Sequence, residues 1–91
     1  MNKKYIYSVL LKEVPKGYYV YIPDWDIHTQ GDTIKDSIRM AKDALNLIGA
    51  EYIEEGIEFP ESKNNNSIKG FEYRTSIELD IENYNQKLKQ K

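Results

Sequence analysis

The chain has 91 residues, of which 13 are basic and 15 acidic, and it contains no cysteine. This length supports one domain with a single modest core, and the nearly balanced charge does not indicate a nucleic-acid surface. The lack of cysteine excludes a disulfide framework, thiol catalysis and cysteine-based zinc sites. No apolar run is long enough to span a membrane, so we expect a soluble cytoplasmic domain.

Two strands joined by a tight turn are predicted at the start of the chain. Residues 5–14 alternate loosely between the two sides of a strand. Val14-Pro15-Lys16-Gly17 has proline and glycine at the positions that a type I turn favours. In a second strand, residues 18–22, the aliphatic side chains share one face. Tyr19 and Tyr21 then lie on the opposite face.

A short connection leads from this hairpin to a capped helix. Pro23 cannot donate a hydrogen bond to a sheet, so the second strand ends there, and residues 27–30 could add a very short third strand. Thr33 is the expected helix N-cap, because its hydroxyl can accept from the first helical turn. Asp36, three residues later, can reach back as the acid of a capping box.

The predicted helix has one apolar face, which we expect to pack against the core. Its aliphatic residues recur at steps of four and three, which places them on one side. They are Ile34, Ile38, Ala41, Leu45 and Ile48. Gly49 could close the helix or lie inside it. Because the apolar pattern continues beyond Gly49, we expect the helix to run to about Glu55 and to stop at Gly56.

A polar loop and one further strand follow the helix. Residues 61–67 contain no apolar side chain and predict a loop. Residues 71–81 alternate cleanly between apolar and polar side chains, which indicates a strand with one buried face. The expected buried residues are Phe71, Tyr73, Thr75, Ile77, Leu79 and Ile81. In the tail, residues 82–91, the spacing of Tyr84 and Leu88 could support a short helix.

The element order is therefore β-β-β-α-β-α. An antiparallel sheet with its helices packed on one face buries every apolar stripe at once, so we predict an α+β fold.

The acidic connection before the helix contains the only histidine, His28, near Asp24, Asp26 and Asp32. Imidazole and carboxylates could form a metal or acid–base site. A single histidine without fixed ligand spacing is more typical of a polar loop whose aspartates cap turns. Asp24 could also pair with Asp80 in a magnesium-binding nuclease site, although a solvated Asp80 is the commoner outcome. We predict no catalytic residue, no metal and no cofactor.

Aromatic residues provide the stronger indication of function. Trp25 either folds over the sheet as part of the core, the commoner outcome, or anchors a partner. Tyr19 and Tyr21 would emerge on the uncovered side of the sheet, and exposed aromatic side chains there usually indicate binding. The predicted partner-binding residues are Tyr19, Tyr21, Asp24, Trp25, Asp26 and His28.

Five glutamates occur close together with no basic residue among them. They are Glu51, Glu54, Glu55, Glu58 and Glu61. Such a run is usually a solvated face. Its functional alternative is complementarity to a basic partner, which speeds association more than it adds affinity.

The sequence resembles the HicB antitoxin family over residues 5–91. The resemblance rests on an aromatic-rich strand that runs into Ile-Pro-Asp-Trp, on His-Thr-Gln-Gly-Asp-Thr, on a helix with Met-Ala-Lys-Asp-Ala-Leu, and on Glu-Glu-Gly before Phe-Pro-Glu-Ser. Its most specific part is Pro23-Asp24 followed by residues 29–33 at this spacing. Residues 25–28 differ from the leucine, proline, glycine and small residue usual there.

The resemblance implies a partial RNase H-like fold that is generally catalytically degenerate. It also implies a function, which is to bind and block HicA, a small basic RNA-cleaving toxin. Many family members add a C-terminal DNA-binding domain, and this chain ends at Lys91, about where that domain would begin. We therefore expect a single HicB-like domain over residues 1–91, without direct DNA binding, that could also form homo-oligomers.

An antitoxin that occludes the RNA-binding or active site of a HicA-like ribonuclease toxin is thus the main functional hypothesis. Two alternatives come from other classes of protein. One is a metal-dependent, RNase H-type nuclease that uses Asp24 and Asp80. The other is an orphan protein-interaction domain of mobile-element origin.

Overall fold

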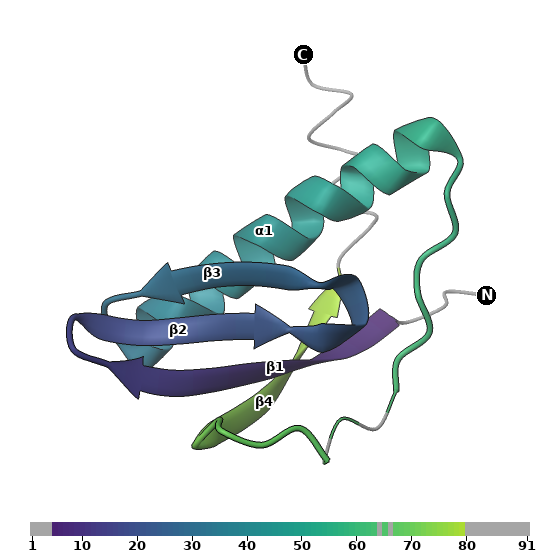
Figure 1. Cartoon of the computed structure of the whole chain (residues 1–91). Helices are drawn as coiled ribbons and strands as arrows, with labels where there is room; N and C mark the ends of the chain where they lie inside the picture. Colours follow the sequence, from purple (N-terminus) through teal and green to yellow (C-terminus); the bar gives the residue numbers. More distant parts are fainter. Residues whose placement is uncertain (1–4, 64, 66, 80–91) are drawn as a thin grey trace.

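The computed structural model describes residues 5–63, 65 and 67–79. In chain order its elements are β1 (Tyr5–Val14), β2 (Gly17–Ile22), a 3-10 turn η1 (Pro23–Trp25), β3 (Ile27–Gly31), α1 (Ile34–Glu55) and β4 (Tyr73–Leu79) (Figure 1). The predicted order of strands and first helix is confirmed. The short second helix predicted in residues 82–91 lies outside the described residues.

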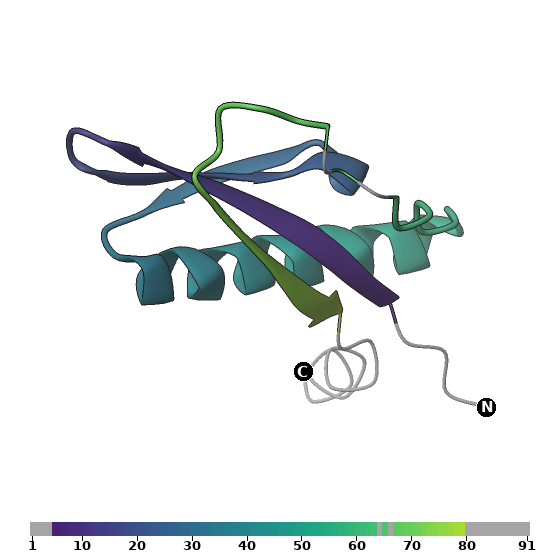
Figure 2. The ribbon, with the colours of Figure 1, turned by 90° about the horizontal axis from the view of Figure 1, so that it is seen from below.

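The strands form one antiparallel sheet in the order β3-β2-β1-β4. The helix α1 crosses one face of this sheet, as the view from below shows (Figure 2). The core lies between these two layers and takes most of its side chains from the sheet. Its buried members are Tyr7, Val9, Leu11, Val20, Ile22, Trp25, Ile27, Ala41, Leu45, Ile77 and Leu79. The described residues thus form a small α+β fold, and none of their helices is long and apolar enough to cross a membrane.

A two-residue turn joins β1 to β2 and fixes the register of the sheet. Val14 pairs with Gly17, so Pro15 and Lys16 form the turn as the sequence predicts. Gly17 has a φ of 137°, a conformation that favours glycine. A Cβ at this position would also lie only 2.3 Å from the carbonyl oxygen of Gly31. Glycine is therefore required where the hairpin meets the end of β3.

The start of α1 is capped as predicted, with one difference in detail. The backbone N–H of Asp36 donates to Thr33 Oγ1 at 3.0 Å. The carboxylate of Asp36 accepts from the N–H of Asp32 at 3.0 Å, one residue before the N-cap. Just upstream, a Cβ on Gly31 would lie 2.6 Å from the Cα of Ser37. The end of β3 therefore packs directly on the first turn of the helix.

Replacing Thr33 with alanine should lower the free energy of unfolding by about 1 kcal/mol, because the cap hydrogen bond to the first helical turn is lost. The variant Thr33→Ser keeps the hydroxyl and serves as the matched control. Urea unfolding can be followed by the fluorescence of Trp25, the single tryptophan. Equal midpoints for Thr33→Ala and the parent chain would show that this cap does not stabilise the helix.

Most of the predicted core-facing stripe of α1 is confirmed: Ala41 and Leu45 are buried, and Ile38 and Ile48 pack partly buried against the core. The buried residues of α1 are Ser37, Ala41, Leu45, Gly49 and Ala50. Ile34 is 38% exposed, so its assignment to the core face is wrong. Small residues occupy the closest contact with the sheet, because a Cβ on Gly49 would already lie 3.2 Å from Leu79 Cδ1. Ser37 tolerates burial because its hydroxyl donates to the carbonyl of Thr33 at 2.6 Å.

The helix ends where the sequence predicts. Gly56 has a φ of 70°, and its N–H donates to the carbonyl of Ile53. The N–H of Ile57 donates to the carbonyl of Tyr52 at 2.9 Å. These bonds satisfy the last helical turn, as a glycine in the left-handed conformation commonly does. Gly49 is accordingly an interior glycine.

The last described strand, β4, is shorter than predicted at its start. The chain bends at Glu72, and β4 begins only at Tyr73. Phe71 was expected on the buried face with Ile77. Instead its ring stacks against Tyr19 and Tyr21, on the opposite side of the sheet. The bend separates Phe71 from the alternation of the strand, so the prediction for this residue is wrong. Tyr73, also expected to be buried, is 39% exposed, and Ile81 lies outside the described residues.

Candidate protein-interaction face

The sheet face opposite α1, called the open face here, carries a group of stacked rings. Tyr21 and His28 lie with ring centroids 4.6 Å apart and planes 19° apart. The ring of Phe71 stacks against those of Tyr19 and Tyr21, with centroid distances of 6.2 and 5.9 Å. These four residues, Tyr19, Tyr21, His28 and Phe71, are named the aromatic cluster.

The register of the sheet brings these side chains together. Tyr21 pairs with His28 on β3 and with Leu10 on β1. Tyr19 pairs with Lys12 on β1, and the Lys12 ammonium lies 5.2 Å from the centre of the Tyr19 ring. Paired residues of an antiparallel sheet point to the same face, so the cluster follows from strand pairing. The ammonium adds a cation–π contact at its rim.

His28 is held by hydrogen bonds on both ring nitrogens. The hydroxyl of Tyr19 is bonded to Nδ1, and Nε2 lies 3.1 Å from Asp26 Oδ1. Asp26 reaches this position from the end of η1, where its φ is 53° and its N–H donates to the carbonyl of Pro23. Asp tolerates this left-handed conformation better than most residues. The histidine therefore has a fixed orientation on an exposed surface.

Trp25 lies in the core, which confirms the commoner of the two outcomes considered for this residue. Its side chain is 7% exposed, and its ring contacts those of Tyr7, Tyr52 and Phe59 at 5.4, 4.9 and 5.3 Å. Burial raises the pKa of the neighbouring Tyr7, whose hydroxyl donates to the carbonyl of Pro60 at 2.8 Å. The indole thus packs between the sheet and the segment after α1.

Asp24 faces a loop and not the aromatic cluster. Its Oδ1 accepts from the N–H of Lys63 at 3.3 Å and from the side-chain amide of Asn65 at 3.4 Å. The guanidinium of Arg74 donates to the carbonyl of Asn65 at 2.9 Å and also to that of Ile68. In Figure 2 the segment before β4 passes on the side of the sheet away from α1. Hydrogen bonds thus hold the polar loop predicted from the sequence beside the open face.

Of the six predicted partner-binding residues, the structure therefore brings Tyr19, Tyr21, Asp26 and His28 together. Sequence reasoning missed Phe71 on this face. Leu10 is completely buried, although it lies opposite the helix. The alternation of β1 already placed Leu10 on that side, whereas no local signal predicted the bend that brings Phe71 there.

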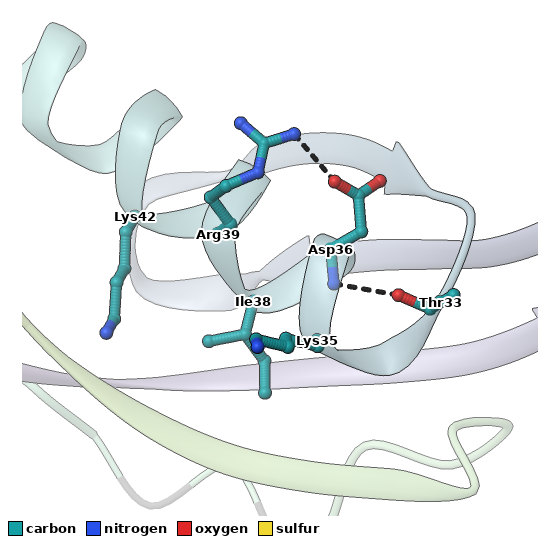
Figure 3. Close-up of a pocket in the computed structure, with 6 residues that line it drawn as sticks. All are labelled: Thr33, Lys35, Asp36, Ile38, Arg39 and Lys42. Atoms are coloured by element: carbon teal, nitrogen blue, oxygen red, sulfur yellow. Dashed lines mark hydrogen bonds and ion pairs between the residues drawn. The ribbon is translucent and has the colours of Figure 1, made fainter.

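A second candidate feature is a hollow of about 500 Å³ beside the start of α1 (Figure 3). It is lined by Thr33, Lys35, Asp36, Ile38, Arg39 and Lys42. The N–H of Asp32, and then the guanidinium of Arg39 at 2.6 Å, lower the pKa of Asp36. Arg39 also contacts Asp43 at 3.3 Å. The polar contacts of this hollow thus belong mainly to the helix cap.

The structure tests only part of what the sequence predicted for the acidic residues. Asp80, the proposed partner of Asp24 in a nuclease site, lies outside the described residues. Within residues 5–63, 65 and 67–79, no three His, Asp or Glu side chains gather in a group that could hold a metal ion. The five glutamates of residues 51–61 are all exposed, and the described residues include no ion pair to any of them.

Comparisons with known proteins identify a fold. No model of a known family matches the sequence, and no curated protein matches it. Among solved structures, the chain is similar to a chain of a toxin–antitoxin complex from Streptococcus pneumoniae, with a TM-score of 0.76. The alignment covers 90% of this chain and 73% of the other, at 20% sequence identity. At this identity the likeness shows a shared α+β fold.

Proposed function

We propose that this chain is an antitoxin of the HicB type, with the partial RNase H-like fold of that family. In this proposal it binds a small, basic, HicA-like ribonuclease toxin in the cytoplasm and covers the RNA-binding or active site of the toxin. It acts as a binding module and not as an enzyme. The proposal treats residues 1–91 as one HicB-like domain.

The observation that carries this proposal is the aromatic cluster on the open face. Tyrosine is enriched at protein interfaces and among the residues that dominate their binding energy. Here Tyr19 and Tyr21 are half-buried, and ring stacking and the hydrogen bonds of His28 hold them in place. Side chains that are already ordered lose little entropy on binding. The fold shared with a chain of a toxin–antitoxin complex supports the same class of function.

The proposed contact surface is centred on Tyr19, Tyr21, His28 and Asp26. Asp26 is the exposed acid of this group, with a side chain 82% exposed, and can pair with a lysine or arginine of the toxin. Asp24 and Trp25, the other predicted contacts, would act indirectly. Asp24 holds the loop beside the open face, and Trp25 supports the turn that presents Asp26.

The acidic residues of α1 would speed the approach of a basic toxin. Replacing Glu51, Glu54 and Glu55 with lysine should slow association by about tenfold at low salt and by less at high salt, because screening weakens long-range attraction. Stopped-flow measurements at two salt concentrations test this. The variant Glu13→Lys is the control, because it measures how one charge reversal at an exposed site on β1 changes the association rate. Unchanged association rates in the triple variant would remove steering from the proposal.

A pull-down with the tagged full chain tests the proposed partner. We expect a small basic protein to co-purify in equimolar amount and to cleave RNA once it is separated from the chain. Recovery of no such protein would favour an orphan interaction domain. Magnesium-dependent RNA cleavage by the chain alone, lost in Asp24→Asn, would favour the nuclease alternative instead.

A further inference from the structure

The chain leaving α1 passes the start of β1 at one end of the molecule (Figure 1). Two adjoining hollows are lined by residues of these segments. The first, of about 370 Å³, is lined by Tyr5, Ile53, Ile57, Glu58 and Phe59. The second, of about 330 Å³, shares Tyr5 and Phe59 and adds Ile6, Pro60, Glu61 and Ser62 among its lining residues. The rings of Tyr5 and Phe59 meet edge to face at 5.0 Å and belong to both hollows. This surface is named the acid-rimmed end.

Exposed apolar side chains are concentrated at the acid-rimmed end. Six large apolar side chains are exposed in the part of the chain that the structure describes. Three of them, Ile6, Ile53 and Ile57, line these hollows and are 48%, 39% and 47% exposed. Isolated exposed aliphatic residues are normal, but a group of them around hollows indicates an interaction site.

The two charged side chains that the described residues contribute to the lining of the hollows are both acidic. Residues 51–62 contain five glutamates and no lysine or arginine. Glu58 lines the first hollow and Glu61 the second. Both are exposed, and no ion pair between described residues involves them. A ligand that fills the hollows would therefore place its own charged groups beside the carboxylates of Glu58 and Glu61.

We propose that the acid-rimmed end binds an amphipathic segment of a partner protein that carries lysine or arginine beside large aliphatic side chains. The aliphatic side chains occupy the two hollows against Ile53, Ile57 and the Phe59 ring. The basic groups lie against Glu58 and Glu61. An apolar groove that receives one face of a helix is a common mode of peptide recognition, and the carboxylates select a basic segment. This surface is separate from the aromatic cluster and does not depend on the proposed antitoxin function.

Three synthetic peptides test the chemistry of this site with the full chain. The first is a helix of about 14 residues with leucine on one face and lysine on the other. The second has glutamate in place of lysine, and the third has serine in place of leucine. We expect saturable binding of the first peptide, with amide chemical-shift changes centred on Ile53, Ile57 and Phe59. The other two should bind at least about tenfold more weakly, which corresponds to about 1.4 kcal/mol.

Variants of the chain locate the binding. Ile53→Ser with Ile57→Ser, and separately Glu58→Lys with Glu61→Lys, should each weaken binding of the leucine–lysine peptide by about tenfold or more. Because these side chains are exposed, the variants should fold. Leu47→Ser, at the 58% exposed residue of α1, and Glu13→Lys are the matched controls and should bind like the parent.

Any of three results would overturn the proposal. The first is equal binding of all three peptides, and the second is chemical-shift changes centred on Tyr19 and Tyr21. The third is a dimer of the parent chain in sedimentation that the variant Ile53→Ser with Ile57→Ser does not form, because a second copy of the chain would then cover these residues.

Discussion

Replacing Leu45 with alanine is expected to lower the free energy of unfolding by about 2 to 5 kcal/mol. Leu45 is completely buried in the layer between α1 and the sheet, so its truncation removes apolar contacts and leaves a cavity. A domain of this size is stabilised by only about 5 to 15 kcal/mol, so a large share of its stability depends on this side chain. Urea unfolding followed by Trp25 fluorescence measures the change.

The same helix provides a control of identical chemistry. Leu47 lies two residues further along α1 and is 58% exposed. Leu47→Ala should change the free energy of unfolding by no more than about 0.5 kcal/mol. If the two variants unfolded at the same urea concentration, the assigned buried face of α1 would be wrong.

Replacing Tyr21 with alanine is expected to weaken binding of the proposed toxin by about 30-fold or more, which corresponds to about 2 kcal/mol. Tyr21 lies at the centre of the aromatic cluster, where it stacks against both His28 and Phe71. Its loss would remove contact area and release two neighbouring rings. Calorimetric titration with the purified toxin measures the affinity, and a thermal melt of the variant confirms that it is folded.

Two further variants distinguish a role of the aromatic cluster in binding from a general effect of replacing a tyrosine. Tyr73 is a 39% exposed tyrosine outside the aromatic cluster, and Tyr73→Ala should leave the affinity almost unchanged. Tyr19→Phe removes only the hydroxyl that is bonded to His28, and should have an effect between those of Tyr73→Ala and Tyr21→Ala. Loss of affinity in Tyr73→Ala with normal affinity in Tyr21→Ala would move the interface away from the open face.

The parts of the fold that depend on local chemistry could be predicted from the sequence. The turn at Pro15, the N-cap at Thr33 and the stop at Gly56 each need particular residues, and the structure has them there. The alternation of β2 likewise gives the face that carries Tyr19 and Tyr21. These features depend on the residues and their immediate neighbours in the chain.

The parts that depend on distant contacts could not be predicted. The buried stripe of α1 runs through Ser37 and Gly49, because close packing on Gly31 and Leu79 favours small residues there. A search for aliphatic residues assigned Ile34 to this face instead. Phe71 joins the aromatic cluster only because the chain bends before β4. Burial of Trp25 likewise depends on the segment that follows α1.

The proposed function requires that this chain silence a ribonuclease by binding it. The most direct measurement is the rate of RNA cleavage by the co-purified basic protein, with and without an equimolar amount of this chain. We predict that the chain suppresses cleavage, and that Tyr21→Ala restores much of it at the same concentration. Full cleavage in the presence of the parent chain, under conditions where the two proteins form a complex, would contradict the proposed function.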